Sequence, residues 1–451
     1  MTAAGRRVAM LVLNDMRLDS RVRREAASLA VAGYDVTVHA VATDATRDRP
    51  RETVDGYVIC RHPMLTRPHP DSVTAGSVSS RTATTAVRLT AARAFASTRP
   101  LFGGALHFTL NWQLRWSRWG RRVADVAEPA DIWHAHDLPT LPAALECARR
   151  HGGQVLYDSH ELYVDAGATA RLPWLVRRAL LRRERQWAER ADAVITVNPA
   201  VAAVLRARLG REDVTVVRNC AEPPMGPSPL RESIGLDAET PLLIYHGSIT
   251  IGRGLEALID AMRLPMLARA HLVLMGYGPL RPALQAHATA SLAAERIHFL
   301  APVPPEVVTT WVSGADVAVM PIEPTTLNHR LSTPNKLFEA IAAGVPVVGP
   351  DFDGFRRVVR EAPWGPVGVL HANHAPASIA AAAAELLALS PSERAEMHAR
   401  CRTATTTELC WSLEVERLRE VYAGLSLTAA RVEPSFAPLG VAPAATLRDA
   451  E

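Results

Sequence analysis

Lys336 is the only lysine in the 451-residue sequence, and it lies in the segment Thr-Pro-Asn-Lys-Leu-Phe-Glu at residues 333 to 339. Arginine replaces lysine freely on a solvated surface, but less freely where a compact ammonium must meet a phosphate as a point charge. Thr333 as a cap and Pro334 at the first position predict that a helix begins here. Because free N–H groups and the helix dipole attract anions, we expect Asn335 and Lys336 to bind a diphosphate.

Glu339 follows Lys336 by three residues and shares nearly the same face of the predicted helix. A carboxylate at that position accepts two hydrogen bonds from a vicinal diol such as a ribose. A lysine for phosphates and a glutamate for a ribose together predict a nucleotide site. The alternative is an ordinary lysine–glutamate pair on a helix surface.

Glycine-rich turns follow two predicted strands in the same half of the chain. Tyr-His-Gly-Ser ends one strand at residues 245 to 248, and Arg253 then stands between two glycines. Small neighbours let a guanidinium approach phosphate oxygens closely, so Arg253 is the second predicted cation for the diphosphate. Gly-Tyr-Gly at residues 276 to 278 is a weaker signal, because such turns are common in α/β proteins. These turns predict donor contacts from Gly247, Ser248, Gly276 and Tyr277.

Polar residues also follow predicted strands in the first half of the chain. His-Ala-His-Asp occupies residues 134 to 137, and Tyr-Asp-Ser-His-Glu occupies residues 157 to 161. His160 is the best candidate to contact the acceptor or the transferred group, because an imidazole gives or takes a proton near neutral pH. A histidine bonded only to a neighbouring loop is the alternative. The predicted acceptor-side contacts are Asp19, Ser20, Arg21, His136, Asp137 and His160.

Two other kinds of site are disfavoured. The spacing of His134, His136 and Asp137 resembles that of metal ligands, but no third cluster completes a site, so no metal is predicted. The loop after the first predicted strand contains no Gly-x-Gly-x-x-Gly motif. That counts against a dinucleotide held in the first half, and therefore against an oxidoreductase.

Alternating β-rich runs and helical segments must position these residues. Strands are predicted at residues 8–13, 36–41, 131–135, 154–158, 193–197 and 214–217, and then at 242–246, 271–275, 297–300, 317–320, 345–349 and 367–370. Helical segments between them, beginning with residues 21–32, indicate an α/β chain with two doubly wound parallel sheets. Two such Rossmann-like domains bring their strand ends to one central cleft, which is the expected site.

The predicted domain boundaries follow from composition. Residues 6–220 form an N-terminal acceptor-side domain with an insertion at about 65–125. The proline-rich stretch from residue 221 opens a C-terminal nucleotide-binding domain that extends to residue 405. A last helix is predicted at 406–425, and the alanine- and proline-rich residues 426–451 read as a disordered tail.

Composition narrows the class further. With 48% hydrophobic residues, 21% charged residues and a net charge of +4, the chain fits two ordinary cores and gives no indication of nucleic-acid binding. The five cysteines show no metal-ligand spacing and fit a reducing compartment. Neither a membrane span nor a secretory signal is recognisable, so a cytoplasmic protein is expected.

Two arginine-rich stretches suggest contact with a membrane surface. Residues 88–122 carry Trp112, Trp116 and Trp119 among arginines, and residues 172–190 carry two tryptophans and six arginines. Each stretch can form an amphipathic helix that lies on an anionic membrane, which would make the protein peripheral at the inner face. The favoured alternative is a helix with one face in the core and one in solvent.

Taken in order, these motifs resemble the retaining GT-B glycosyltransferases of family four over about residues 6–422. The matching segments are HAHD (134–137), YDSHEL (157–162), GRGLEALIDA (252–261), LVLMGYGPL (272–280), ADVAVMP (315–321) and NKLFEAIAAGVPVV (335–348). The resemblance implies a UDP-, GDP- or other sugar nucleotide in the C-terminal domain and a lipid-linked, glycan or small-molecule hydroxyl acceptor in the N-terminal domain. It implies sugar transfer with retained anomeric configuration, in glycan, glycolipid or natural-product biosynthesis, without a metal.

The same resemblance assigns roles to individual positions. Arg253 and Lys336 resemble the catalytic pair that binds the diphosphate, and Glu339 resembles the ribose-binding glutamate. His160 resembles the histidine beside the sugar, and Val303 falls near the segment whose backbone reads the base. Glycosyltransferase activity on a nucleotide sugar is the resulting expectation.

Two positions depart from the family pattern. Leu331 stands eight residues before Glu339, where the family often has a glutamate that contacts the donor sugar, and Ser248 stands where an arginine is common. Asn328, His329 or Arg330 are candidates to replace the missing sugar contact. A non-hydrolysing sugar-nucleotide epimerase and a non-catalytic GT-B scaffold subunit therefore stay as alternatives, whereas pyridoxal-phosphate phosphorylases have far longer chains.

Overall fold

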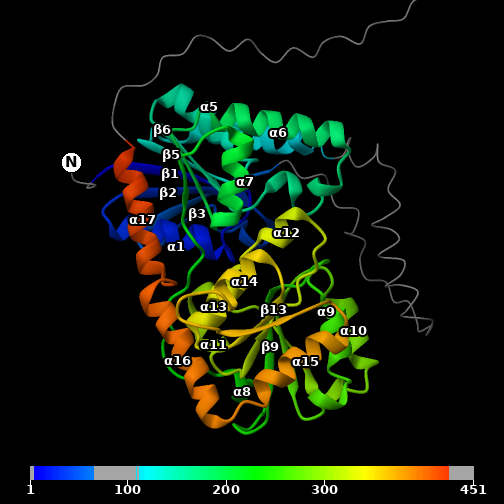
Figure 1. The fold of residues 1–451 in the computed structure, drawn as a ribbon. Coiled ribbons are helices and arrows are strands. Elements are labelled where there is room, and N and C mark those ends of the chain that lie inside the picture. The colour runs from blue at the N-terminus through cyan, green and yellow to red at the C-terminus, as the bar shows by residue number, and fades with distance from the viewer. Residues whose placement is uncertain (1–4, 65–107, 109–110, 426–451) are drawn as a thin grey trace, which may run out of the picture.

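The computed structural model describes residues 5–64, 108 and 111–425, which fold into two α/β lobes (Figure 1). One sheet contains strands from residues 7 to 216, and the other contains strands from residues 242 to 371. Residues 65–107 of the predicted insertion and the whole predicted tail lie outside the described residues. The described segments between strands are mostly helical, as the alternating pattern predicts.

The first sheet has eight strands in the order β3-β4-β2-β1-β5-β6-β7-β8. All its neighbours pair in parallel except β3 with β4. From β1 the chain continues to β2 on one side of the sheet and later to β5 on the other side. The loops after β1 and β5 therefore diverge and leave a crevice at the carboxyl ends of these strands. Its strands are β1 (Arg7–Leu11), β2 (Asp35–Ala42), β3 (Arg51–Val54), β4 (Tyr57–Pro63), β5 (Ile132–His136), β6 (Gln154–Ser159), β7 (Ala193–Thr196) and β8 (Val214–Val216).

The helices of the first lobe join these strands. Asp19 caps the first of them, because its carboxylate accepts the backbone N–H of Val22 at 3.0 Å. The helices are α1 (Ser20–Val31), the π-helical turn η2 (Asn111–Trp116), α4 (Ser117–Val126), α5 (Leu141–His151), α6 (Trp174–Ala188) and α7 (Pro199–Leu209), with short 3₁₀ turns at η1 (Asp44–Thr46), η3 (Tyr163–Asp165) and η4 (Thr169–Arg171).

The second sheet has six parallel strands in the order β11-β10-β9-β12-β13-β14. They are β9 (Leu242–Ser248), β10 (His271–Tyr277), β11 (Ile297–Leu300), β12 (Val317–Val319), β13 (Val347–Pro350) and β14 (Gly368–His371). The helices of this lobe are α8 (Leu230–Ser233), α9 (Leu255–Ala261), α10 (Arg281–Thr289), α11 (Val308–Val312), α12 (Leu327–Leu331), α13 (Asn335–Ala342), α14 (Asp353–Val359), α15 (Pro376–Leu387) and α16 (Pro391–Thr407), with 3₁₀ turns at η5 (Pro265–Leu267), η6 (Ala294–Arg296) and η7 (Pro305–Val307).

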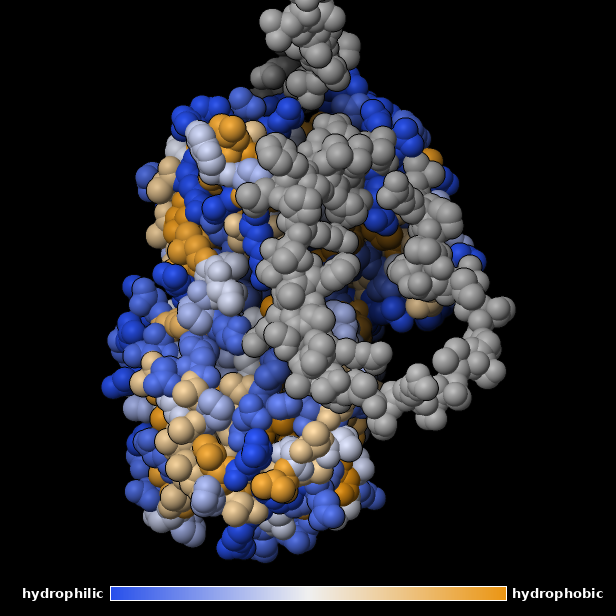
Figure 2. Space-filling model, turned by 90° about the vertical axis from the view of Figure 1, so that its right-hand side faces the viewer, coloured by the Kyte–Doolittle hydropathy of each residue, from blue (hydrophilic) through white to orange (hydrophobic). Residues whose placement is uncertain are grey.

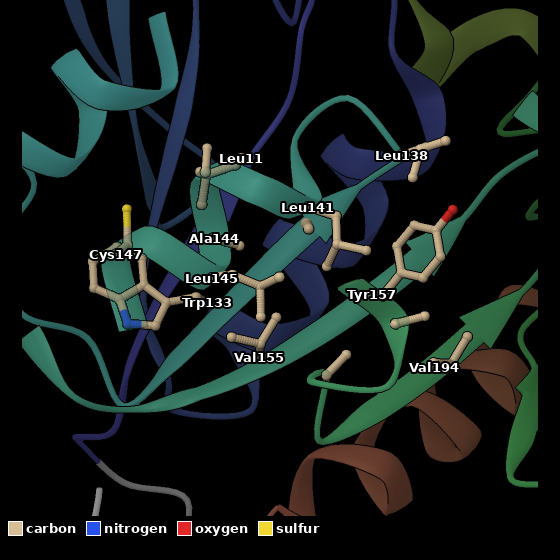
Figure 3. Close-up of a cluster of buried hydrophobic side chains, with 14 of the residues drawn as sticks. Leu11, Trp133, Leu138, Leu141, Ala144, Leu145, Cys147, Val155, Tyr157 and Val194 are labelled. Carbon is tan, nitrogen blue, oxygen red and sulfur yellow. The ribbon is translucent and has the colours of Figure 1, made fainter. Parts of the chain in front are cut away.

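Apolar side chains fill the space between each sheet and its helices. In the first lobe, Trp133 and Val155 of the central strands pack with Leu141 and Leu145 of α5 (Figure 3). The indole N–H of Trp133 donates to the carbonyl oxygen of Gly152 at 2.8 Å, so its polar atom is satisfied. These continuous hydrophobic runs are the signal that predicts buried parallel strands.

The last helix, α17 (Trp411–Gly424), returns to the first lobe after α16 has packed on the second (Figure 1). Trp411, Leu418 and Tyr422 enter the core of the first lobe, and the Tyr422 ring meets Tyr34 edge-on at 5.4 Å. The Tyr422 hydroxyl also lies 2.9 Å from Nδ1 of the buried His134. The last described helix thereby contacts β5, the strand that carries both histidines of the His-Ala-His-Asp motif.

The β3–β4 hairpin is absent from the predicted strand list. It adds the one antiparallel pair of the first sheet, so that sheet is mixed rather than wholly parallel. Its turn is Asp55-Gly56, with φ of 47° and 83°. Positive φ at both central residues is what a tight hairpin turn requires, and an Asp-Gly pair between alternating runs is the signal that could have predicted it.

Residues 88–107, 109 and 110 of the first arginine-rich stretch lie outside the described residues; its described part, residues 108 and 111–122, follows the predicted alternative, whereas the second stretch has both buried and exposed apolar residues. Trp119 is 2% exposed and belongs to the core, while Trp112 stacks on Trp187 at 5.8 Å. On α6, by contrast, Trp174 and Leu175 are 66% and 63% exposed. No helix in the described ranges is both long and apolar enough to cross a bilayer. On the face shown in Figure 2, hydrophobic residues are scattered among hydrophilic ones in both lobes.

Candidate active site

A cavity of about 1240 Å³ lies between the two lobes. The first lobe contributes Ser20 and His160 among its predicted contacts. The second lobe contributes every predicted donor contact: Gly247, Ser248, Arg253, Gly276, Tyr277, Val303, Asn335, Lys336 and Glu339. Residues separated by more than 300 positions thus meet in one space, because both sheets present the carboxyl ends of their strands to it.

Glycines at the ends of β9 and β10 give the second lobe an open floor. A Cβ atom at Gly276 would lie 1.8 Å from the carbonyl oxygen of Gly247, so only glycine permits these two turns to touch. Gly247 itself has a φ of 105°, and a Cβ there would lie 3.4 Å from the Lys336 ammonium. The missing side chains leave the ammonium accessible across the turn.

Lys336 is buried without a carboxylate bonded to it. Its ammonium donates to the Tyr245 hydroxyl at 2.7 Å and lies 3.9 Å from the centre of that ring. Burial, and then the positive charge of Arg253, hold the pKa of Lys336 well below its usual range, and the Glu339 charge opposes them only in part. An anion bound between Lys336 and Arg253 would raise the pKa of Lys336 again, because it would give each cation a partner of opposite charge.

Arg253 is the second cation of the cavity wall. It lies between Gly252 and Gly254, with φ of 83° and 67°, in the turn that leads into α9. Its Nε is buried and has no hydrogen-bond partner among the described residues. A buried guanidinium N–H without an acceptor is costly, so this donor is suited to an anion bound in the cavity.

Glu339 lies one turn inside α13 and is held by β9. Its Oε2 accepts a hydrogen bond from Nε2 of His246 at 3.0 Å. Burial alone would raise the pKa of this carboxyl, but the His246 contact and the nearby cations lower it below the ordinary value. The group is therefore an ionised acceptor at neutral pH, suited to the hydroxyls of a ribose.

The start of α13 differs from the prediction in one respect. The helix begins at Asn335, and Pro334, not Thr333, occupies the capping position without a side-chain bond. The Thr333 cap was wrong because its hydroxyl faces the other lobe, where it accepts from Nδ2 of Asn198 at 3.2 Å. Asn335 likewise donates to the Ser20 hydroxyl at 2.8 Å, so both residues join the lobes.

His160 stands on the opposite wall between two acids. Its Nε2 lies 3.0 Å from Asp158, and its backbone N–H donates to Asp137 at 3.1 Å. Burial lowers the pKa of His160, but the charges of Asp137 and Asp158 outweigh it and raise the pKa to about 10. His160 is therefore an imidazolium at neutral pH, which favours hydrogen-bond donation over the proton uptake that the sequence left open.

Behind His160, Arg21 forms a buried ion-pair network. Its guanidinium donates to both oxygens of Asp158, at 2.8 and 3.0 Å, and to Asn219 at 2.7 Å. Glu25 lies 3.0 Å from the same guanidinium. Burial raises the pKa of Glu25 to about 8 even though Arg21 opposes it, so Glu25 keeps a proton at neutral pH. The network fixes Asp158, which in turn fixes His160.

The network also contains a group of potential metal ligands. Atoms of Glu25, His134, His136 and Asp158 lie within 4.8 Å of one another. The expectation that no third cluster would complete a metal-like set was wrong, because α1 and β6 supply Glu25 and Asp158, while Asp137 stays outside. Arg21 already bonds to Asp158 and faces Glu25, and that fixed positive charge opposes a second cation there. We assign the cluster to the ion-pair network.

The six acceptor-side candidates divide into two groups. Ser20 and His160 line the cavity. Four others are outside the lining and act behind it: Asp19 caps α1, Arg21 pairs with Asp158, His136 lies 3.1 Å from His160, and Asp137 accepts from the His160 backbone. These four residues support the cavity wall without lining it. Their positions near strand ends in the sequence do not show whether a residue supports the wall or contacts a ligand directly.

The structure also places Leu331 and the three residues proposed to replace the missing sugar contact. Leu331 packs against the core of the first lobe and does not line the cavity. Of the three proposed substitutes, Asn328 and His329 line the cavity and Arg330 does not. Both polar atoms of the Asn328 amide are engaged by the first lobe, through the backbone N–H of Leu162 at 3.0 Å and Glu161 at 3.1 Å.

The first-lobe part of the cavity is largely apolar. Phe108 and Trp116 line it together with Tyr163 and Leu172, and the Phe108 and Trp116 rings meet edge-on at 5.9 Å. The cavity or lobe-joining residues that escaped the sequence-based prediction include Glu161, Asn198 and His246. Glu161 and His246 lie inside quoted motifs directly beside a predicted residue, so their strand-end positions were the available signal.

Comparisons with known proteins agree with this architecture. The model of Glycosyltransferase Family 4 matches residues 19–223, and the model of Glycosyl transferases group 1 matches residues 240–389. The D-inositol 3-phosphate glycosyltransferase of Xylanimonas cellulosilytica is 31% identical over 199 residues. That match covers 43% of this chain and 45% of the relative, so it spans less than half of either.

Solved structures show the same fold over most of the chain. Sucrose-phosphate synthase from Thermosynechococcus elongatus has a TM-score of 0.65 at 18% identity, covering 93% of this chain and 99% of that one. Anabaena HepE, solved with UDP and glucose, has a TM-score of 0.66 at 14% identity, covering 93% and 100%. These likenesses confirm the predicted pair of Rossmann-like domains of the GT-B fold. The chain belongs to the glycosyltransferases, with a family 4 domain followed by a group 1 domain.

Proposed function

We propose that the protein transfers a sugar from a nucleoside-diphosphate sugar to a hydroxyl acceptor with retention of anomeric configuration, in the synthesis of a glycan, a glycolipid or a natural product. The observation that carries this proposal is that the buried ammonium of Lys336, in the first turn of α13, and the buried Nε of Arg253, just before α9, have no bonded carboxylate among the described residues. Glu339 lies beside them as an ionised acceptor for a ribose.

The diphosphate is the leaving group of this reaction. Negative charge develops on it as the bond to the sugar lengthens, and fixed cations aimed at that charge lower the barrier without reorganising. Lys336, Arg253 and the first N–H groups of α13 are the groups in position to do so. No metal ion is needed for this purpose, because the protein supplies both positive charges.

Retention follows if the acceptor attacks the face that the phosphate leaves. In this scheme the acceptor oxygen bonds to the anomeric carbon as the phosphate departs, and a phosphate oxygen takes the acceptor proton. His160, which stays an imidazolium, donates a hydrogen bond to the sugar and takes no proton. The scheme uses no protein nucleophile.

The acceptor side favours a molecule with an apolar part. Phe108, Trp116 and Leu172 line the cavity, and the exposed Trp174 and Leu175 lie directly beyond Leu172 on α6. The neighbouring exposed arginines of α6 would meet anionic lipid headgroups. We therefore include peripheral contact with a membrane, tested by flotation with anionic and neutral liposomes; no binding to anionic liposomes at low salt would remove that part.

Thermal-shift measurements with UDP, GDP, ADP and their common sugar conjugates test the proposal first. A ligand at a hundred times its Kd stabilises the folded protein by about 2.7 kcal/mol. At least one nucleotide should raise the melting temperature of the wild type, and Lys336→Ala should abolish that rise. If no nucleotide stabilises the protein, the proposed donor site is wrong.

Product analysis then separates the alternatives. The stabilising sugar nucleotide is incubated with candidate acceptors, and the anomeric configuration of the product is read by NMR. An inverted product contradicts the same-face scheme. Conversion of the donor to an isomer without any acceptor would indicate an epimerase, and donor binding without turnover on any acceptor would favour a scaffold subunit.

A further inference from the structure

Two carboxylates line the cavity, and they belong to different lobes. Glu339 faces the cations of the second lobe and is bonded to His246. Glu161 comes from the loop after β6 and directly follows His160. Its position puts an acid on the first-lobe wall, next to the imidazolium and across from the predicted nucleotide contacts.

The Glu161 carboxylate is held by the opposite lobe. Nδ2 of Asn328 donates to its Oε2 at 3.1 Å, and Oδ1 of Asn328 accepts the backbone N–H of Leu162 at 3.0 Å. Asn328 is 7% exposed, so this amide is a buried clamp on the loop that carries Glu161. The other carboxylate oxygen, Oε1, has no partner among the described residues and remains available to a ligand.

Burial, which is the largest effect, and the charge of Asp137 raise the pKa of Glu161 to about 7, although the cations His160 and Arg253 act in the opposite direction. Near neutral pH the group is therefore present both as a carboxylate, which accepts hydrogen bonds from hydroxyl groups, and as an acid, which donates to them. A sugar attached to the diphosphate carries several hydroxyl groups that can pair with Oε1 in either form.

We propose that Glu161 binds hydroxyl groups of the transferred sugar and selects among donor sugars, with Asn328 as the residue that positions it. The inference rests on the proposed glycosyl transfer. It gives the first lobe a role in choosing the donor, although the nucleotide contacts lie in the second. It also offers a replacement for the family glutamate that Leu331 lacks, because Glu161 brings a carboxyl group to the cavity from the other lobe.

The test compares a nucleoside diphosphate with its sugar conjugate. UDP and UDP-glucose, or whichever pair stabilises the wild type, are titrated by calorimetry into wild type, Glu161→Gln and Asn328→Ala. Glu161→Gln should leave the Kd of the diphosphate within about twofold and weaken the sugar conjugate by about ten- to a hundredfold. Monodeoxy-sugar donors show which hydroxyl is bound, because their penalty should shrink in the variant.

Controls separate this inference from the proposed function. Glu339→Gln should weaken the diphosphate itself. If Glu161→Gln misfolds, Glu161→Asp is used in its place. This variant keeps the carboxyl group but shortens the side chain, and it should lose affinity for the conjugate. Asn328→Ala should reproduce the loss of deoxy-sugar discrimination at an unchanged Kd for the diphosphate. Equal weakening of diphosphate and conjugate in Glu161→Gln, or no weakening, overturns the inference; failure of the wild type to bind any nucleotide overturns the function instead.

Discussion

In the first lobe the charged side chains behind His160 are bonded to one another, whereas in the second lobe Lys336 and Arg253 face the cavity without a bonded carboxylate. Arg21 alone forms an ion pair with Asp158 and lies 3.0 Å from the protonated Glu25. Lys336 has a phenol as its hydrogen-bond partner. The difference indicates two tasks: one network fixes the geometry of a wall, and the other keeps its charge for a ligand.

Asp158→Asn should break the first network and have the largest effect. Removing one partner of a buried ion pair costs about 3–5 kcal/mol of unfolding free energy, because Arg21 keeps a buried charge. Urea denaturation measures the loss. Asp125→Asn is the matched control, because Asp125 pairs with Arg150 at the surface and is 61% exposed. Equal stability of both variants would mean that the first-lobe network is not structural.

Lys336→Ala should affect catalysis and not stability. Losing one fixed positive group at the leaving phosphate lowers kcat by about 10²–10³-fold. The unfolding free energy should stay constant or rise, because the variant no longer buries an ammonium. Steady-state kinetics and denaturation on the same sample test both halves of the prediction.

Lys336→Arg sharpens this point. A longer, forked guanidinium should misplace the diphosphate and lower turnover, even though the charge is kept. Near-normal kinetics for the arginine variant would show that the lone lysine is not required.

The two walls should also respond to pH with opposite sign. The pKa of His160 rises from 6.5 in the unfolded chain to about 10 in the folded protein, so its contribution is complete below pH 6.5 and is lost as pH rises towards 10. The stability difference between wild type and His160→Gln should shrink over that window, as measured by denaturation at pH 6, 8 and 9.5. A constant difference would contradict the raised pKa.

For Lys336 the sign is reversed. Its folded pKa lies below the value of 10.5 for the unfolded chain, so the unfolded state binds more protons between the two values. Wild type should therefore gain stability relative to Lys336→Met as pH rises through this window. If the stability difference between wild type and variant changed with pH in the same direction for His160 and Lys336, the two walls would not differ in this respect.

Removal of metal ions should have the smallest effect. Glycosyl transfer in EDTA should match transfer without it, because Lys336 and Arg253 supply the positive charge at the diphosphate. The comparison is made on dialysed protein, with added Mg²⁺ and Mn²⁺ as separate arms. A large loss in EDTA that either ion restores would show that the two side chains are insufficient.

The sequence predicts most of this molecule because its signals are local. Hydrophobic runs such as residues 154–158 mark strands, and the glycines around Arg253 mark a turn. Apart from the β3–β4 hairpin, whose Asp-Gly signal is local, what it does not predict depends on contacts between segments far apart in the chain. Thr333 reads as a helix cap until Asn198 takes its hydroxyl, and the clamp of Asn328 on Glu161 joins residues 167 positions apart. The metal-like cluster forms within the first lobe, but its members come from α1, β5 and β6 and can be recognised only once these elements are brought together.

Within the described residues the chain crosses between the lobes twice, after β8 and between α16 and α17, and Arg218 joins the crossings. Its guanidinium donates to Glu414 and Glu408, each at 2.7 Å. Two crossings bonded at one edge permit the lobes to rotate about the line between them but resist sliding and twisting. Opening and closing of the cavity should therefore follow a single hinge axis, and the contacts of Asn335 with Ser20, of Thr333 with Asn198 and of Asn328 with Glu161 should break together.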